Sequence, residues 1–129
     1  MCLTRDNLIL SYGEFFHITS REAAERILVE GLLPQQTDTI TPGSRPLICV
    51  APGEQSNRWR DQYEEPVIFR IVAADIISKE YGIDHTFSGW DLAETMGDIE
   101  GLRHMIEENA TLAVFERIPP EELTVVEGM

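Results

Sequence analysis

The segment FFHITSREAAERILVEGLLP, residues 15–34, carries the strongest structural signal in this sequence. Its first five residues place aromatic and β-branched side chains around His17, which is typical of a short buried strand. Thr19 is followed three residues later by Glu22, the capping-box spacing that begins a helix. Gly31 tolerates a positive φ and is suited to end that helix. The segment therefore predicts a strand, a capped helix and a glycine stop.

His17 lies at the end of the predicted strand, where rigid structure can hold its imidazole within reach of a ligand. Thr19, Glu22 and Gly31 have structural duties in this pattern, and His17 has none, so we predict that it faces a ligand. The alternative is a strand-end histidine that is hydrogen-bonded to a backbone carbonyl.

The predicted helix has an inward face, because apolar residues recur in it at spacings of three and four. These residues are Ala23, Ala24, Ile27, Leu28 and Leu32.

The length of 129 residues suits one domain with a single core, spanning residues 1–129. Two cysteines, Cys2 and Cys49, do not suggest a disulfide framework, and no spacing typical of a metal site occurs. The N-terminus lacks a basic region followed by an apolar run, and no apolar stretch approaches the roughly 20 residues of a membrane span. We therefore expect a cytoplasmic protein without a metal site.

The sequence is strongly acidic, with a formal net charge of −13. Residues 1–71 hold seven basic and ten acidic residues, a net charge of −3, whereas residues 72–129 hold three and 13, a net charge of −10. This balance argues against electrostatic binding to bulk nucleic acid or to an anionic membrane. The acidic half predicts a partner protein with a basic surface, or else it serves solubility.

The rest of the sequence alternates short strands with helices. Residues 34–46 are rich in proline, threonine and glutamine and predict a surface loop, and residues 1–13 are weakly patterned, as in an arm or an extra strand. No GxGxxG or GxxxxGK[ST] motif follows a strand, so neither a Rossmann nor a P-loop nucleotide site is expected. The order of elements favours an α+β fold. Strands are predicted at residues 47–51, 66–72, 110–115 and 123–126, and helical segments at residues 54–60, 75–81 and 99–108.

Several of these segments together resemble the ADP-ribosyltransferase-like superfamily, which includes DarT-type toxins, RNA 2′-phosphotransferases and small proteins that begin with a "YHITT" strand. The most specific part is HITS at residues 17–20, followed by AAERILVEGLLP at residues 23–34. The resemblance implies an ADP-ribosyltransferase-like split β-sheet core with flanking helices. Similar to later strands of the superfamily are LICVAP at residues 47–52, PVIFRI at residues 66–71 and AVFERIPPEEL at residues 113–123.

In that superfamily three strand-borne residues build a cleft for NAD. The resemblance assigns the first of them to His17, which would hold a ribose or the nicotinamide end, with Ile18 and Thr19 beside it. The second is commonly Tyr, Ser or Thr, and in this sequence Cys49 lies in the corresponding zone. NAD is accordingly the cofactor that the resemblance implies.

The third residue of that set is a glutamate that stabilises the oxocarbenium-like state as nicotinamide leaves, because a fixed anion stabilises developing positive charge. The resemblance leaves Glu108 and Glu116 as its candidates, with Glu108 first. Arg21 and Arg45 are candidates for contacts with the pyrophosphate, because guanidinium groups pair bidentately with phosphate oxygens. Each of these arginines is alternatively a solvated surface residue.

The leading hypothesis from the sequence is an ADP-ribosyltransferase-like protein that binds NAD or a related nucleotide and modifies a protein or nucleic-acid target. The alternative is a catalytically inactive, acidic interaction protein that inhibits a basic nucleoprotein, as phage-encoded inhibitors of host defence do in the host cytoplasm. A toxin or antitoxin component is a third hypothesis.

Overall fold

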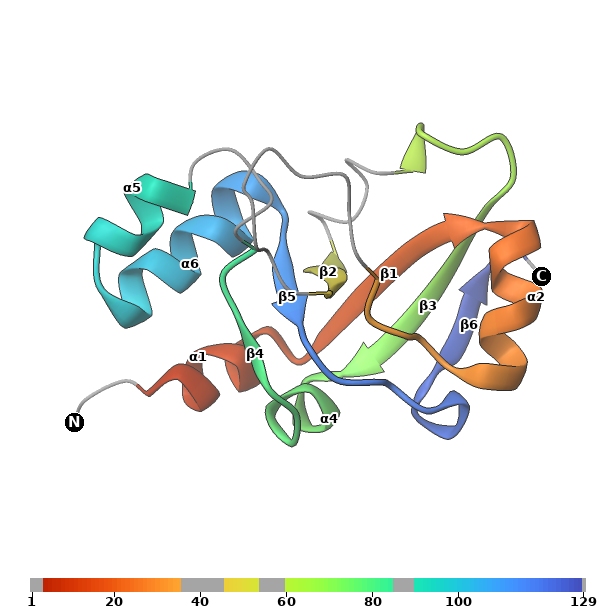
Figure 1. Cartoon of the computed structure of the whole chain (residues 1–129), viewed down its shortest axis with the longest axis horizontal. Helices are drawn as coiled ribbons and strands as arrows, with labels where there is room; N and C mark the ends of the chain where they lie inside the picture. Colours follow the sequence, from red (N-terminus) through yellow and green to blue (C-terminus); the bar gives the residue numbers. More distant parts are fainter. Residues whose placement is uncertain (1–3, 36–45, 54–59, 85–89, 129) are drawn as a thin grey trace.

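A six-stranded antiparallel sheet is the framework of residues 4–35, 46–53, 60–84 and 90–128, the residues that this computed structural model describes (Figure 1). The strands lie in the order β4-β5-β2-β1-β3-β6. They are β1 (Glu14–Ser20), β2 (Ile48–Pro52), β3 (Pro66–Val72), β4 (Tyr81–Gly82), β5 (Leu112–Val114) and β6 (Thr124–Glu127). The same residues include five α-helices and one 3-10 turn: α1 (Arg5–Tyr12), α2 (Arg21–Glu30), α4 (Ala73–Ile77), α5 (Trp90–Thr95), α6 (Asp98–Asn109) and η1 (Pro120–Glu122). The predicted α+β class is confirmed.

Most predicted elements lie where the sequence pattern places them. The predicted strands after residue 46 correspond to β2, β3, β5 and β6, and the last predicted helix corresponds to α6. The helical turn expected at residues 75–81 begins two residues earlier, as α4, and Tyr81 already belongs to β4. The pattern does not predict α5, because residues 82–97 show no clean period. The predicted helix at residues 54–60 and most of the loop at 34–46 lie outside the described residues.

Strand β1 is paired along its whole length with β3 but only at one end with β2. Seven residue pairs join β1 to β3. Only Phe15 and Phe16 of β1 pair with β2, opposite Pro52 and Ala51. The ladder between β1 and β2 ends at Phe16, so the two neighbouring strands separate from His17 onward.

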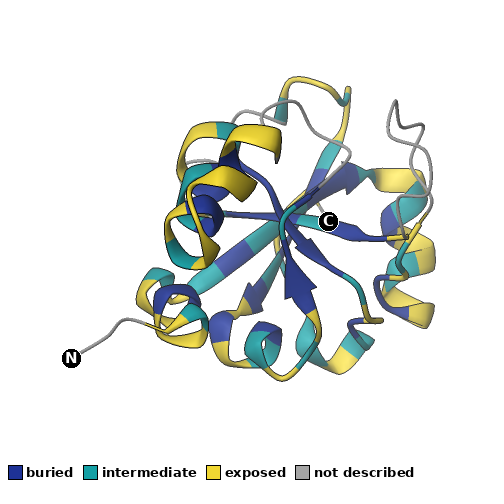
Figure 2. Ribbon diagram, turned by 60° about the vertical axis from the view of Figure 1, so that its left-hand side comes forward, coloured by how far each residue is buried: buried dark blue, intermediate teal, exposed yellow. Residues whose placement is uncertain are grey.

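One face of the sheet carries the apolar core. Side chains alternate along a strand, so Val67, Phe69 and Ile71 of β3 point to the same face. Val67 and Phe69 pack with Ala24 of α2, and Ile71 packs into the larger cluster under α1, α4 and α6. Figure 2 shows buried residues concentrated along the strands, with exposed residues on the outer sides of the helices. The larger cluster includes Leu8, Ile9, Phe15, Ile48, Val50, Ile76, Leu102, Ile106, Leu112 and Val114.

Helix α1 replaces the arm or extra strand that the pattern of residues 1–13 suggests. The hydroxyl of Thr4 caps it by accepting a hydrogen bond of 3.1 Å from the Asn7 amide. Leu8 and Ile9 are its buried residues. Two adjacent apolar residues do not produce a helical period, and for this reason the helix is not visible in the sequence pattern.

The N-cap of α2 is Ser20, so the predicted capping box of Thr19 with Glu22 is wrong. The Ser20 hydroxyl accepts a hydrogen bond of 3.2 Å from the Ala23 amide. Thr19 still belongs to β1, where it lies opposite Val67 and is buried. The strand thus extends one residue further at each end than predicted, to Glu14 and to Ser20. This shift removes Glu22 from the third helical position, at which a capping-box carboxylate acts.

Gly31 ends α2 as predicted, with φ of 82° and ψ of −178°. A Cβ at this position would lie 2.3 Å from the carbonyl oxygen of Ile118. The same oxygen accepts a hydrogen bond of 2.8 Å from the Leu32 amide. Gly31 therefore lets the chain leave α2 in close contact with the segment before η1.

We expect Gly31→Ala to lower the free energy of unfolding by about 3 kcal/mol or more, because strain in a glycine-only backbone region adds to the clash with Ile118. Gly97→Ala is the matched control. Gly97 has φ of 94° and ψ of 176°, and nothing lies within 4 Å of a Cβ built there. Urea unfolding of both variants separates the clash from the strain. Equal losses of stability would contradict the close contact at Gly31.

Candidate functional site

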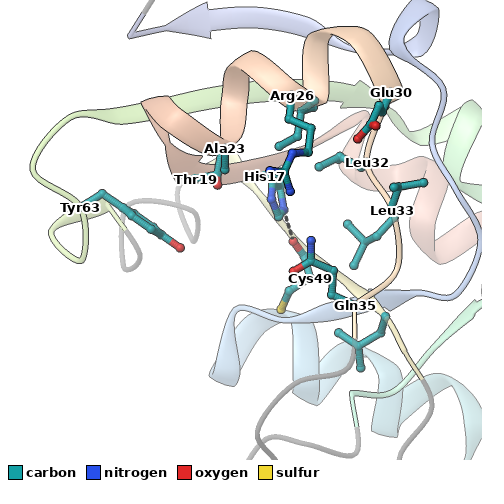
Figure 3. A pocket seen from close by; sticks show the side chains of 14 residues that line it. His17, Thr19, Ala23, Arg26, Glu30, Leu32, Leu33, Gln35, Cys49 and Tyr63 are labelled. Atoms are coloured by element: carbon teal, nitrogen blue, oxygen red, sulfur yellow. Dashed lines mark hydrogen bonds between the residues drawn. The ribbon is translucent and has the colours of Figure 1, made fainter.

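A pocket of about 340 Å³ opens where β1 and β2 separate. Its walls come from β1, from one face of α2, from the chain that follows α2 and from β2 (Figure 3). This volume is at the lower end of the range of small-molecule sites. The polar side chains that line it are His17, Thr19, Arg26, Glu30, Gln35 and Tyr63.

His17 bridges the two strands at the point where their ladder has ended. Its Nδ1 lies 2.8 Å from the carbonyl oxygen of Cys49 (Figure 3). A buried backbone carbonyl needs a hydrogen-bond partner, and the parted strands no longer supply a backbone amide for this one. The imidazole supplies the missing donor and remains in the pocket wall. The carbonyl-bonded and the ligand-facing interpretations of His17 are therefore compatible.

The hydrogen bond determines which nitrogen of His17 carries hydrogen. A carbonyl oxygen can only accept, so we assign the hydrogen to Nδ1, which leaves Nε2 as an acceptor in the neutral ring. Desolvation by burial lowers the pKa of His17, and the hydrogen bond to the Cys49 carbonyl opposes this effect. Among the described residues, Nε2 has no hydrogen-bond partner. At neutral pH the pocket thus presents a fixed, uncharged acceptor.

Cys49 contributes its backbone to the site and keeps its thiol protonated. The Sγ atom lies 3.7 Å from Oδ2 of Asp84, a buried carboxylate. Burial, together with the neighbouring Asp84 carboxylate, raises the pKa of the Cys49 thiol. A protonated thiol is a poor nucleophile, so Cys49 does not supply nucleophilic chemistry at neutral pH.

Helix α2 contributes polar pocket residues that the sequence pattern does not single out. Ala23, Arg26, Ile27 and Glu30 lie at spacings of three and four, so one stripe of the helix faces the pocket. Tyr63 approaches the pocket from the segment before β3 (Figure 3). The sequence places Arg26 and Glu30 on the helix that follows His17, and this position is the one sign that they could line the site. Charged residues on a helix are usually solvated, so the pattern does not single them out.

The structure brings together His17, Thr19 and Cys49, three of the residues that the resemblance implies for ligand binding. Ile18 is buried between the two pocket residues of β1 and points to the opposite face of the strand. Arg21 is exposed in the first turn of α2 and does not line this pocket. Arg45 lies outside the described residues.

The two predicted catalytic glutamates do not line this pocket. Glu108 is exposed near the end of α6. Glu116 is exposed after β5, and its Oε2 accepts a hydrogen bond of 2.8 Å from the Glu80 amide. The carboxylate that the structure places in the pocket wall is Glu30.

In the described part of the chain, no group of three or more His, Cys, Asp or Glu side chains is arranged to hold a metal ion. No helix among these residues combines the length and apolarity that a bilayer crossing requires. Comparison with models of known protein families found no match, and a search of curated proteins found no related sequence.

The lowered pKa of His17 predicts a pH dependence of stability. Between the folded pKa and the ordinary value of 6.5, the unfolded chain binds more protons at this residue than the folded chain does. The contribution of His17 to the free energy of unfolding is therefore retained above pH 6.5 and lost as the pH falls through the pKa of the folded state. His17→Asn keeps a donor near the Nδ1 position but does not titrate. The stability difference between wild type and His17→Asn, measured by urea unfolding, should shift in favour of the variant from pH 7.5 to pH 5. Parallel pH profiles would contradict the burial of a neutral imidazole.

Proposed function

We propose that this protein is ADP-ribosyltransferase-like and binds NAD or a related nucleotide in the pocket between β1 and β2. The observation that carries the proposal is the fixed imidazole of His17, which donates to the Cys49 carbonyl at 2.8 Å and leaves Nε2 as an acceptor. The separation of β1 from β2 forms the pocket, and the His17 side chain donates the hydrogen bond that the Cys49 carbonyl no longer receives from the backbone.

The chemistry of the pocket wall suits a nucleotide. Ribose hydroxyls donate hydrogen bonds, and the neutral Nε2 of His17 can accept one. Thr19 lies two residues along the same strand and provides a hydroxyl in the same wall. Arg26 provides a guanidinium group, which pairs with phosphate oxygens. These groups together match a ribose joined to a phosphate.

The segments that carry the resemblance also supply residues of the pocket. The segment HITS at residues 17–20, on which the resemblance mainly depends, contains two pocket residues, His17 and Thr19. The LICVAP segment at residues 47–52 supplies Cys49, whose carbonyl His17 binds. Glu108 and Glu116 lie outside the pocket wall. The geometry of the pocket therefore supports only the nucleotide-binding part of the proposal, and transfer of ADP-ribose rests on the resemblance alone.

Isothermal titration calorimetry with NAD and ADP-ribose tests the proposal. Wild type should bind, and His17→Asn should bind about three- to tenfold more weakly, because it keeps the donor to the Cys49 carbonyl and loses one hydrogen bond to the ligand. His17→Ala should lose more, because the carbonyl is also left without its partner. Glu22→Gln, an exposed change outside the pocket wall, is the control and should bind like wild type. Failure of wild type to bind, or equal binding by His17→Asn, would refute the proposal.

A second candidate function is supported by the outer surface of α5 and α6. Arg103 is the one arginine or lysine of these two helices, and it pairs with Glu100 at 3.6 Å. A surface of this kind suits a partner with a basic surface, and we propose a nucleoprotein as that partner. The exposed acidic residues of the two helices are Asp91, Glu94, Asp98, Glu100, Glu107 and Glu108.

Co-purification with a basic ribonucleoprotein at increasing salt tests this second function. Retention should fall as salt rises, because the screening length shortens from about 10 Å at 0.1 M to about 3 Å at 1 M. The double variant Asp91→Asn, Glu94→Gln should weaken retention several-fold, whereas Glu64→Gln, Glu65→Gln removes the same charge from another exposed segment and should not. His17→Ala should have no effect. Equal retention of both double variants would exclude the α5–α6 surface as the binding site for the basic partner.

A further inference from the structure

Helix α5 is held close against α6 by one of its sides. The buried Ala93 of α5 faces Gly101 of α6, where a Cβ would lie 2.0 Å from the Ala93 carbonyl oxygen. Glycine allows two backbones to approach this closely, so the position of α5 on α6 is fixed. Figure 1 shows the two helices at the end of the molecule opposite α2.

The outer side of α5 carries two apolar side chains that the fold does not bury. Leu92 is 52% exposed and Met96 is 42% exposed. They are four residues apart in the same helix and are therefore neighbours on its surface. A single exposed apolar residue is ordinary, whereas adjoining ones with a polar rim mark a contact surface.

The charge around this apolar pair has one sign. Residues 90–100 hold four acidic residues and no arginine or lysine. Two of the acids, Asp91 and Glu94, are exposed on α5 itself. Arg5 offsets a third, Asp98, at 3.2 Å. The exposed apolar surface of α5 is therefore bordered by negative charge.

A second exposed apolar pair lies on α2 but does not specify the charge of a partner. Leu28 and Val29 are exposed there. The charged residues of α2 are two arginines and three glutamates, so both signs surround this pair. Only the α5 pair combines apolar exposure with a rim of one charge, in the comparison of these two helices.

We propose that Leu92 and Met96 anchor a docking surface for a basic, amphipathic helix of a partner protein. A second helix fits this surface, because side chains four residues apart form a ridge that packs into the groove of another helix. Apolar side chains of the partner cover Leu92 and Met96, and its lysines or arginines face Asp91 and Glu94. The acidic rim repels the phosphates of a nucleic acid.

This inference rests on the second candidate function, binding to a basic nucleoprotein, and assigns the contact to the protein component. The two kinds of side chain contribute differently. Complementary charge mainly raises the rate of association, whereas buried apolar contacts mainly slow dissociation.

Fluorescence anisotropy with two synthetic helical peptides tests the proposal. The first peptide has lysines on one face and leucines on the other, and the second has the same lysines with alanines in place of the leucines. Wild type should bind the first peptide about tenfold more tightly, the effect expected from covering two half-exposed apolar side chains. Leu92→Gln, Met96→Gln should remove this preference. Asp91→Asn, Glu94→Gln should weaken both peptides by similar factors.

Leu28→Gln, Val29→Gln is the matched control, because it removes exposed apolar surface from α2, and it should keep the wild-type preference. Thermal unfolding checks that the variants fold, with midpoints expected within about 4 °C of wild type. If the glutamine pair on α5 lowers the midpoint further, Leu92→Ala, Met96→Ala takes its place. Equal binding of both peptides by wild type, or an unchanged preference in the folded α5 variant, would refute the proposal.

The same variant tests other occupants of this surface. Sedimentation velocity detects a second copy of the chain, and anisotropy with a labelled DNA duplex detects nucleic acid. We expect a monomer and no bound duplex. A dimer or a bound duplex that Leu92→Gln, Met96→Gln abolishes would assign the surface to that occupant and overturn the proposal.

The outcomes also separate this inference from the second candidate function. If a basic ribonucleoprotein is released by Asp91→Asn, Glu94→Gln but not by Leu92→Gln, Met96→Gln, the surface acts by charge alone and the anchor role is wrong. If the peptide preference is as expected but no ribonucleoprotein is retained, the docking surface stands and the nucleoprotein partner is wrong. If wild type binds neither, both proposals fail.

Discussion

The hydrogen bond from His17 Nδ1 to the Cys49 carbonyl is the interaction on which the arrangement of the site depends. Strands β1 and β2 are neighbours in the sheet, yet their ladder contains only two residue pairs. Separating two strands inside a sheet exposes backbone groups that have lost their partners, and leaving one buried and unpaired costs about 1–3 kcal/mol. The imidazole offsets this cost at the first residue after the ladder ends. The same bond fixes the ring, lowers its freedom to rotate and directs the second nitrogen to the pocket.

Helix α2 completes the pocket because its two ends are fixed by neighbouring structure. Ser20 begins the helix directly at the end of β1, and Gly31 ends it against the Ile118 carbonyl. Between these points the buried Ala24 holds the helix on β3, and the adjacent stripe, with Arg26 and Glu30, lies over the opening between the strands. The pocket is thus built by elements whose positions are set elsewhere in the core, so Arg26 and Glu30 do not need to hold the fold together.

Local patterns in the sequence predict most of the elements but not their relation in space. The strand around His17, the stop at Gly31 and the helix α6 follow from hydrophobic period and backbone preference, which act within a few residues. The N-cap is misplaced by one residue because the pairing of Thr19 with Val67 is a long-range contact that extends β1. Glu108 and Glu116 are selected by their position along the chain, whereas the lining of the pocket depends on where α2 lies. The separation of β1 from β2 is a property of the sheet. The sequence therefore allows a backbone carbonyl partner for His17 but does not identify it as that of Cys49.

The proposed site requires His17 to be a neutral imidazole with its hydrogen on Nδ1 and an open acceptor at Nε2. Long-range proton–nitrogen NMR spectra of the ¹⁵N-labelled protein at pH 7 observe both ring nitrogens directly. We expect a protonated Nδ1, an unprotonated Nε2 and a change in the Nε2 resonance when NAD is added. A hydrogen on Nε2, or on both nitrogens, would show that His17 does not offer an acceptor to the pocket.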